Sequence, residues 1–186
     1  MLAAGASLID VEFAACTVLA QAGETAVLCG GSAAAYYVPD DYQSLDVDFM
    51  LHVGQARHTV DRALATLGYE RVTEGFYEHP VLPYALEFPV GPLAIGREEV
   101  GSWRTDRRAH ELLHVLTPTD VVRDRFLHYW AWKDESAFRV ALAVARAKPR
   151  EVDLDAVRAW ALRELAADRT YDPEEIDRFF NALAGG

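Results

Sequence analysis

Apolar side chains recur at helical spacing in two segments of the first 116 residues. Residues 8–21 carry this pattern up to Gly23, and residues 55–67 carry it up to Gly68, which predicts two amphipathic helices with glycine C-caps. A short alanine-rich helical turn is expected at 32–37. Between and after these segments lie apolar runs of strand length, at 25–29, 45–51, 69–72, 84–88 and 111–116. This part of the chain therefore predicts a mixed α/β unit.

The pattern becomes entirely helical after Leu116. Thr117, Pro118 and Asp120 form a helix start, with a threonine N-cap, a proline at the first position and an acid in the first turn. Apolar periodicity then predicts helices at 118–132, 135–147, 154–167 and 173–183. We expect an α+β fold, with a mixed β-sheet flanked by helices in residues 1–116 and a helical bundle in residues 117–186.

The composition indicates a globular, reduced protein. Of the 186 residues, 51% are hydrophobic and 25% are charged, and the net charge of −11 argues against a generic nucleic-acid-binding surface. No apolar run approaches the roughly 18 residues of a membrane span, and no basic segment precedes an apolar one at the start. Cys16 and Cys29 lack the spacing of metal ligands. We therefore expect a cytoplasmic location and no contact with a membrane.

The segment from 27 to 51 carries the most informative chemistry. An apolar strand ends in Gly30, Gly31 and Ser32, and a second apolar run contains Asp46 and Asp48. Because alternate residues of a strand share a face, the two carboxylates project side by side. Carboxylates this close repel each other, and a divalent cation such as Mg²⁺ relieves that repulsion. The alternative is an acidic pair on a solvated edge strand.

The glycine turn suits a phosphate group. Gly30 and Gly31 can bring backbone N–H groups, and Ser32 a hydroxyl, to phosphates at the start of the helical turn. The alternative is an ordinary glycine turn in which Ser32 serves as a helix N-cap.

Gly31-Ser32, a spacer of thirteen residues and Asp46-Val47-Asp48 resemble the signature of the polymerase-beta-like nucleotidyltransferase superfamily. Within it, the resemblance is to the small bacterial AbiEii-like and minimal nucleotidyltransferase group, whose members are often encoded in toxin–antitoxin or phage-defence pairs. It covers roughly residues 24–95. It implies a nucleotidyltransferase-like sheet and a third carboxylate from a later strand.

Glu87 is the candidate for that third carboxylate. In the strand at 84–88, Ala85 and Glu87 face one way while the flanking apolar residues face the other. The resemblance implies an aspartate here more often than a glutamate, and Glu78 is a weaker competitor. The alternative is a cross-strand salt bridge between Glu87 and an arginine.

Three cations of the first C-terminal helix are candidates for the nucleotide. Lys133 falls on the aromatic face of the helix predicted at 118–132, from which it could grip a triphosphate. A helix-end lysine near the C-terminal dipole is the alternative. Arg123 and Arg125 could also meet phosphate, but simple pairing of Arg123 with Asp120 or Asp124 is the favoured interpretation.

One dense basic run, at residues 104–110, could accept an acidic partner or an RNA backbone, but a solvated loop is the favoured interpretation. The histidines share no metal-ligand spacing, and we assign no role to His52, His58, His79, His114 and His128.

The expected function is metal-dependent transfer of an NMP from an NTP to a hydroxyl of RNA or protein, in a toxin–antitoxin or phage-defence setting. Mg²⁺ (or Mn²⁺) neutralises the triphosphate in such reactions. The expected metal ligands and catalytic carboxylates are Asp46, Asp48 and Glu87, and the expected nucleotide contacts are Gly30, Gly31, Ser32, Arg123 and the catalytic Lys133. The alternative is a catalytically degenerate nucleotide-binding protein, or an antitoxin-like partner whose acidic surface masks a basic cognate protein.

Overall fold

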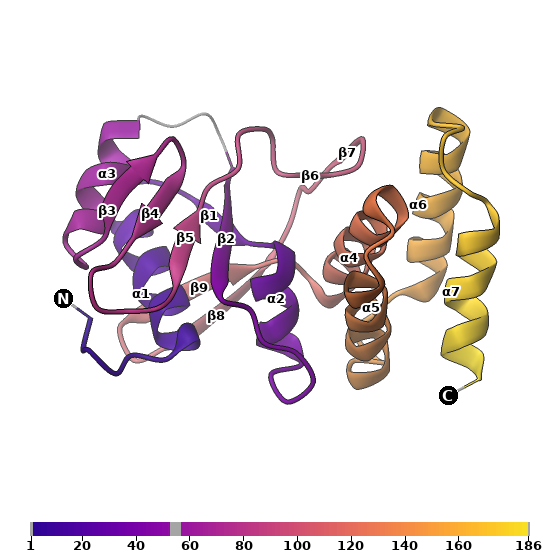
Figure 1. The fold of residues 1–186 in the computed structure, drawn as a ribbon, viewed down its shortest axis with the longest axis horizontal. Coiled ribbons are helices and arrows are strands. Elements are labelled where there is room, and N and C mark those ends of the chain that lie inside the picture. The colour runs from indigo at the N-terminus through magenta and orange to yellow at the C-terminus, as the bar shows by residue number, and fades with distance from the viewer. Residues whose placement is uncertain (1, 53–56, 186) are drawn as a thin grey trace.

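The computed structural model describes residues 2–52 and 57–185, and its centre is a seven-stranded mixed sheet (Figure 1). The strand order is β3-β4-β5-β2-β1-β9-β8. β5 runs parallel to β2 and β9 runs parallel to β1, whereas the other neighbours are antiparallel. The strands span Ala26–Leu28 (β1), Asp46–Leu51 (β2), Glu70–Thr73 (β3), Phe76–Glu78 (β4), Ala85–Glu87 (β5), Arg104–Arg108 (β8) and Glu111–Val115 (β9).

Helices cover both faces of this sheet. α1 packs on β1 and β9 and also contacts α3, while α2 packs on β2 and against α4. In Figure 1, α4 and α5 stand next to α2, and α6 and α7 lie farther from the sheet. The helices span Leu8–Gln21 (α1), Gly30–Tyr37 (α2), Arg57–Ala65 (α3), Pro118–Trp132 (α4), Glu135–Ala147 (α5), Leu154–Ala167 (α6) and Glu174–Ala184 (α7). This arrangement confirms the predicted α+β class.

Local signals fix most helix boundaries. The Thr117 side chain accepts the Asp120 N–H at 3.2 Å and so caps α4, and Asp153 caps α6 in the same way. The predicted bounds of α1, α4, α5 and α6 are confirmed to the residue. α3 ends two residues earlier than predicted, and its predicted start at Gln55 lies outside the described residues. Within the two described ranges, no helix is both long and apolar enough to span a bilayer.

The expectation of a solvated loop at the basic run is wrong, because most of this run forms the edge strand β8. β8 pairs antiparallel with β9, and its charged side chains find acids of the same chain. Arg104 pairs with Asp106 and Glu151, and Arg108 pairs with Asp10 and Glu111. Charged side chains on an edge strand also discourage pairing with other chains. Ala94–Ile95 (β6) and Glu98–Glu99 (β7) form a short antiparallel hairpin.

The hydrophobic core runs without a break from the sheet into the C-terminal helices. Leu116, which ends the sheet region, is buried with Val121 and Phe126 of α4, and the same cluster continues to Phe179 of α7. The predicted domain boundary after residue 116 lies just before the start of α4 at Pro118. The separation into two domains stays a prediction.

Ser32 ties the corner between β1 and α2 to strand β2. Its hydroxyl is fully buried, accepts the Asp48 N–H at 3.0 Å and donates to the Cys29 carbonyl at 3.0 Å. The Cys29 N–H in turn donates to the Asp48 carbonyl at 2.9 Å. Two of these three hydrogen bonds reach the backbone of Asp48 and hold it against this corner, and the third joins Ser32 to Cys29.

Replacing Ser32 with alanine should destabilise the fold. The change leaves the Asp48 N–H without its buried acceptor, which costs about 1–3 kcal/mol, whereas the Cys29 carbonyl still accepts the Ala33 N–H. Urea denaturation followed by circular dichroism measures this loss. Ser102→Ala, at an exposed position, is the control. Equal stability of Ser32→Ala and the wild type would contradict this role of the hydroxyl.

Candidate functional site

Three carboxylates lie on one face of the sheet. Along β2, Asp46 and Asp48 alternate with Val47 and Phe49, which are fully buried on the opposite face. In the parallel pairing of β2 with β5, Glu87 is the direct neighbour of Asp48. Neighbouring residues of a parallel ladder share a face. The structure therefore brings the three predicted carboxylates to the same face.

The first residue of α2 lies directly against Asp48. Gly30 has a φ of +63°, and a Cβ atom at this position would lie 2.2 Å from Asp48 Oδ2. Both the backbone conformation and the lack of space therefore require glycine. A Cβ atom on Gly31 would lie 3.0 Å from the Tyr42 hydroxyl, so this corner contacts Asp48 on one side and Tyr42 on the other.

Asp48 occupies an unfavourable place for a charge. Burial raises its pKa to about 6, and the negative charges of Glu87, Asp124 and Asp46 act in the same direction, while the Arg125 guanidinium opposes them. Both effects disfavour the ionised form of a carboxylate. The site therefore has excess negative charge, which is the electrostatic condition for binding a cation.

Arg125 of α4 is the cation that faces this cluster. Its side chain is 14% exposed and donates to Asp124 Oδ2 at 2.8 Å. Burial opposes its charge, but Asp124 and Asp48 outweigh burial and raise the pKa of Arg125. Arg125 was among the residues predicted for phosphate binding, whereas Asp124 was expected only as a possible partner of Arg123 and His128 was given no role. The spacing of Asp124 and His128, four residues apart on one helix, was the available signal.

A cavity of about 300 Å³ lies between the sheet, at Asp48, and α4. Gly30 and Asp48 form its wall on the sheet side, and Asp124, Arg125 and His128 form its wall on the helix side. The segment that leads into β6 closes a third side with apolar residues. The cavity thus combines carboxylates, a guanidinium and a glycine corner.

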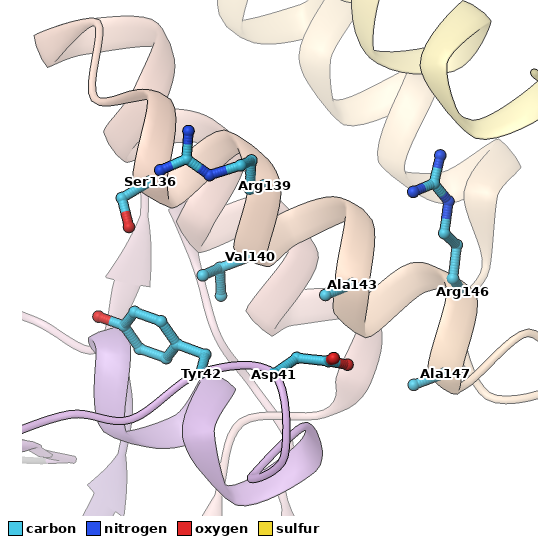
Figure 2. A pocket seen from close by; sticks show the side chains of 8 residues that line it. All are labelled: Asp41, Tyr42, Ser136, Arg139, Val140, Ala143, Arg146 and Ala147. Carbon is cyan, nitrogen blue, oxygen red and sulfur yellow. The ribbon is translucent and has the colours of Figure 1, made fainter. Parts of the chain in front are cut away.

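A wider groove of about 690 Å³ lies between α5 and the loop that follows α2 (Figure 2). Figure 2 shows Asp41 and Tyr42 on the loop and Arg139 and Arg146 on the helix. Arg146 donates to the Ala182 carbonyl at 2.7 Å, whereas Arg139 has no ion pair with any residue in the described part of the chain. Because the Tyr42 hydroxyl adjoins the glycine corner, this groove opens towards the start of α2.

Lys133 and Arg123 are both held by acids outside the cavity. Lys133 ends α4 with a φ of +56°, and its Nζ lies 3.1 Å from Glu175 Oε1 of α7. Arg123 pairs with Asp120 and with Glu98 of β7, at 2.9 Å and 2.8 Å. Neither is among the residues that line the cavity. Their contact with a nucleotide stays a prediction.

The Ser32 hydroxyl is also engaged within the chain. With no exposed surface, it bonds to Cys29 and Asp48 rather than facing the cavity. A role of this corner in phosphate binding stays a prediction. It would rest on the backbone N–H groups of Gly30 and Gly31.

The donor chemistry of the cluster suits a hard divalent cation. Asp46, Asp48 and Glu87 offer carboxylate oxygens, the ligand type that Mg²⁺ prefers, and the raised pKa of Asp48 reflects charge that a cation would offset. Over residues 2–52 and 57–185, no three acidic, histidine or cysteine side chains are already arranged as a metal site. Joint ligation of one ion by Asp46, Asp48 and Glu87 would therefore require their side chains to turn towards one another.

This chain is similar in structure to solved nucleotidyltransferase-like proteins. No protein-family model and no curated protein matches the sequence. An antigenic nucleotidyltransferase-like protein from Paracoccidioides brasiliensis is similar in structure, with a TM-score of 0.53 and 14% identity over 80% of this chain and 85% of its own. The antibiotic-resistance factor ANT(2″)-Ia gives a TM-score of 0.47 at 14% identity, over 81% of this chain and 88% of its own. Its complex with adenylyl-2″-tobramycin gives 0.41 at 13%, over 72% and 92%.

The similarity to the Paracoccidioides brasiliensis protein shows a shared fold. The mixed sheet, its flanking helices and the C-terminal helices together form a nucleotidyltransferase-like fold, as the sequence predicted.

Asp48→Asn should stabilise the protein at neutral pH. In the folded chain the pKa of Asp48 is raised, so the wild type loses stability as the pH rises from 3.8 to about 6. The variant avoids this loss, and its advantage should reach the order of 2 kcal/mol at pH 7 and vanish below pH 4 or so. Urea denaturation at several pH values measures the difference.

Asp40→Asn, which replaces an exposed acid in the loop after α2, serves as the control. An Asp48→Asn variant that is less stable than the wild type at neutral pH would show that Asp48 is not under electrostatic stress.

Proposed function

We propose that this chain is a metal-dependent nucleotidyltransferase that moves an NMP from an NTP to an acceptor hydroxyl. The pairing of Asp48 with Glu87, directly beside the Gly30 corner, is the observation that carries the proposal. The fold shared with a nucleotidyltransferase-like protein supports it. The cavity between this cluster and Arg125 offers room for the reacting phosphate.

Asp46, Asp48 and Glu87 would hold Mg²⁺ or Mn²⁺. When bound, the metal neutralises charge on the triphosphate and favours ionisation of the attacking hydroxyl. The acceptor oxygen forms a bond to the α-phosphorus, the bond to the bridging oxygen breaks, and pyrophosphate leaves. In-line displacement of this kind depends on orientation, which the rigid pairing of β2 with β5 provides.

Arg125 would favour the reactive state of this site. Its charge opposes the upward shift in the pKa of Asp48 and so favours the carboxylate form that a metal needs. The backbone N–H groups of Gly30 and Gly31 would receive the outer phosphates at the start of α2. Arg125 would then face charge that develops on the transferred phosphoryl group.

The acceptor would approach through the groove beside Tyr42, because the Tyr42 hydroxyl lies close to Gly31 and the Arg139 guanidinium in this groove has no ion pair with any described residue. An RNA or a protein hydroxyl fits this proposal. The sequence resemblance further supports membership of the AbiEii-like group, a cytoplasmic location and a cognate partner protein in a toxin–antitoxin or phage-defence pair.

The second candidate is a nucleotide-binding protein that lacks transfer activity. It is favoured by the side-chain arrangement, because in the described ranges no three ligands are already placed around a common point. This candidate binds a nucleotide and gains thermal stability, but it labels no acceptor.

Joint replacement of Asp46 and Asp48 by asparagine should abolish transfer of label from an α-labelled NTP. Two of the three proposed metal ligands are lost, and the loss should reach at least about a hundredfold because charge stabilisation in phosphoryl transfer is large. Autoradiography of acceptor RNA and protein measures transfer. Equal labelling by the double variant and the wild type would refute the proposed site, and a silent wild type that binds NTP would favour the second candidate.

Glu87→Gln should lower transfer by about tenfold or more, because it removes one negative ligand while preserving shape. Glu78→Gln is the matched control. Glu78 is exposed on the neighbouring strand β4, opposite Glu70 and not beside Asp48. The Mn²⁺ concentration for half-maximal activity should rise only for Glu87→Gln. The reverse result would make Glu78 the third carboxylate.

A further inference from the structure

A separate cavity of about 370 Å³ lies between α1, α2 and the loop that leads into β2. Its wall is mostly apolar and includes the rings of Tyr36, Tyr42 and Tyr84. One ionisable acid, Glu12 of α1, also lines it. The volume lies within the range of small-molecule sites, roughly 300–1,000 Å³.

Glu12 is buried, and one of its carboxylate oxygens has no hydrogen-bond partner among the described residues. The residue is 1% exposed, and its Oε1 atom makes no hydrogen bond to any described residue. The adjacent core positions of α1, Val11 and Ala15, are fully buried and apolar. An unpaired buried carboxyl group weakens a fold, so an acid at this position is unfavourable unless a ligand uses it.

The charged groups around Glu12 are already engaged with other residues. Arg108 of β8 attracts the Glu12 carboxylate, but its guanidinium bonds to Asp10 and Glu111, at 2.8 Å and 2.7 Å. The Tyr36 hydroxyl of α2 donates to Asp106 at 2.5 Å. Burial raises the pKa of Glu12 to about 8, with Arg108 acting in the opposite direction. Among the described residues, none supplies the missing donor.

The chemistry of the wall defines the ligand. Aromatic rings attract cations through their faces, and a carboxylate in an apolar site provides the counter-charge. An anion would be repelled by Glu12, and a hard metal ion would need more charged oxygen ligands than one carboxylate among neutral hydroxyl and amide groups in a mostly apolar wall. We propose that this cavity binds a small organic cation, a protonated amine or a guanidinium, with Glu12 as its counter-ion and the tyrosines as its aromatic wall. The proposal does not rest on nucleotidyl transfer.

Isothermal titration calorimetry of the full chain with benzylamine, which is protonated near neutral pH, tests the proposal. We expect saturable binding to the wild type. The affinity of Glu12→Gln should be at least about tenfold weaker, because the variant lacks the charged partner of the amine. Benzyl alcohol has a similar shape without the charge, and it should bind the wild type at least about tenfold more weakly.

Glu24→Gln is the matched control. Glu24 is also buried, at 5% exposure, and its Oε2 likewise lacks a partner among the described residues, but it does not line this cavity. This variant should bind benzylamine as the wild type does. Thermal unfolding of both variants checks that each is folded.

The pH dependence of the wild type gives a test that needs no variant. Because Glu12 must lose its proton to serve as counter-ion, benzylamine should bind about tenfold more tightly at pH 7 than at pH 6. About one proton should be released per ligand, which titrations in buffers of different ionisation enthalpy measure. The absence of saturable binding, equal affinity of Glu12→Gln and wild type, or affinity independent of pH would each overturn the proposal.

Discussion

The contact between Asp48 and the backbone of Gly30 is the constraint on which the site depends. The glycine has no side chain because the carboxylate occupies that space, and the buried Ser32 hydroxyl fixes the corner to the backbone of Asp48. Parallel pairing with β5 then places Glu87 beside the same carboxylate. The glycine corner and the neighbouring strand β5 thus both adjoin Asp48.

This arrangement stores unfavourable electrostatic energy at the site. Asp48 is poorly solvated and close to other acids, and Arg125 offsets only part of that penalty, since the pKa of Asp48 stays raised. Glu12, at the cavity between α1 and α2, is an acid under similar stress, and its Oε1 makes no hydrogen bond to any described residue. Groups that weaken the apo fold in this way are typical of positions where a ligand completes the charge balance.

The sequence predicted features that depend on near neighbours and missed those that depend on distant ones. α4 and α6 follow from their apolar period and their caps, Thr117 and Asp153, all of which are local. The shared face of Asp46 and Asp48 follows from the two-residue period of a strand. By contrast, the arginines of β8 meet acids as distant as Asp10 and Glu151, and no short pattern encodes such pairs.

The same limit explains which cation of α4 reaches the carboxylates. Each residue turns a helix by about 100°, so Arg123 lies about 160° around α4 from Arg125, and Lys133 about 80°. Arg123 accordingly packs on Trp160 of α6, and Lys133 pairs with Glu175 of α7. All three positions look suitable in the sequence, because each is a cation close to aromatic residues. The choice between them is made by which face of α4 packs against the sheet, and that face presents Arg125 to Asp48.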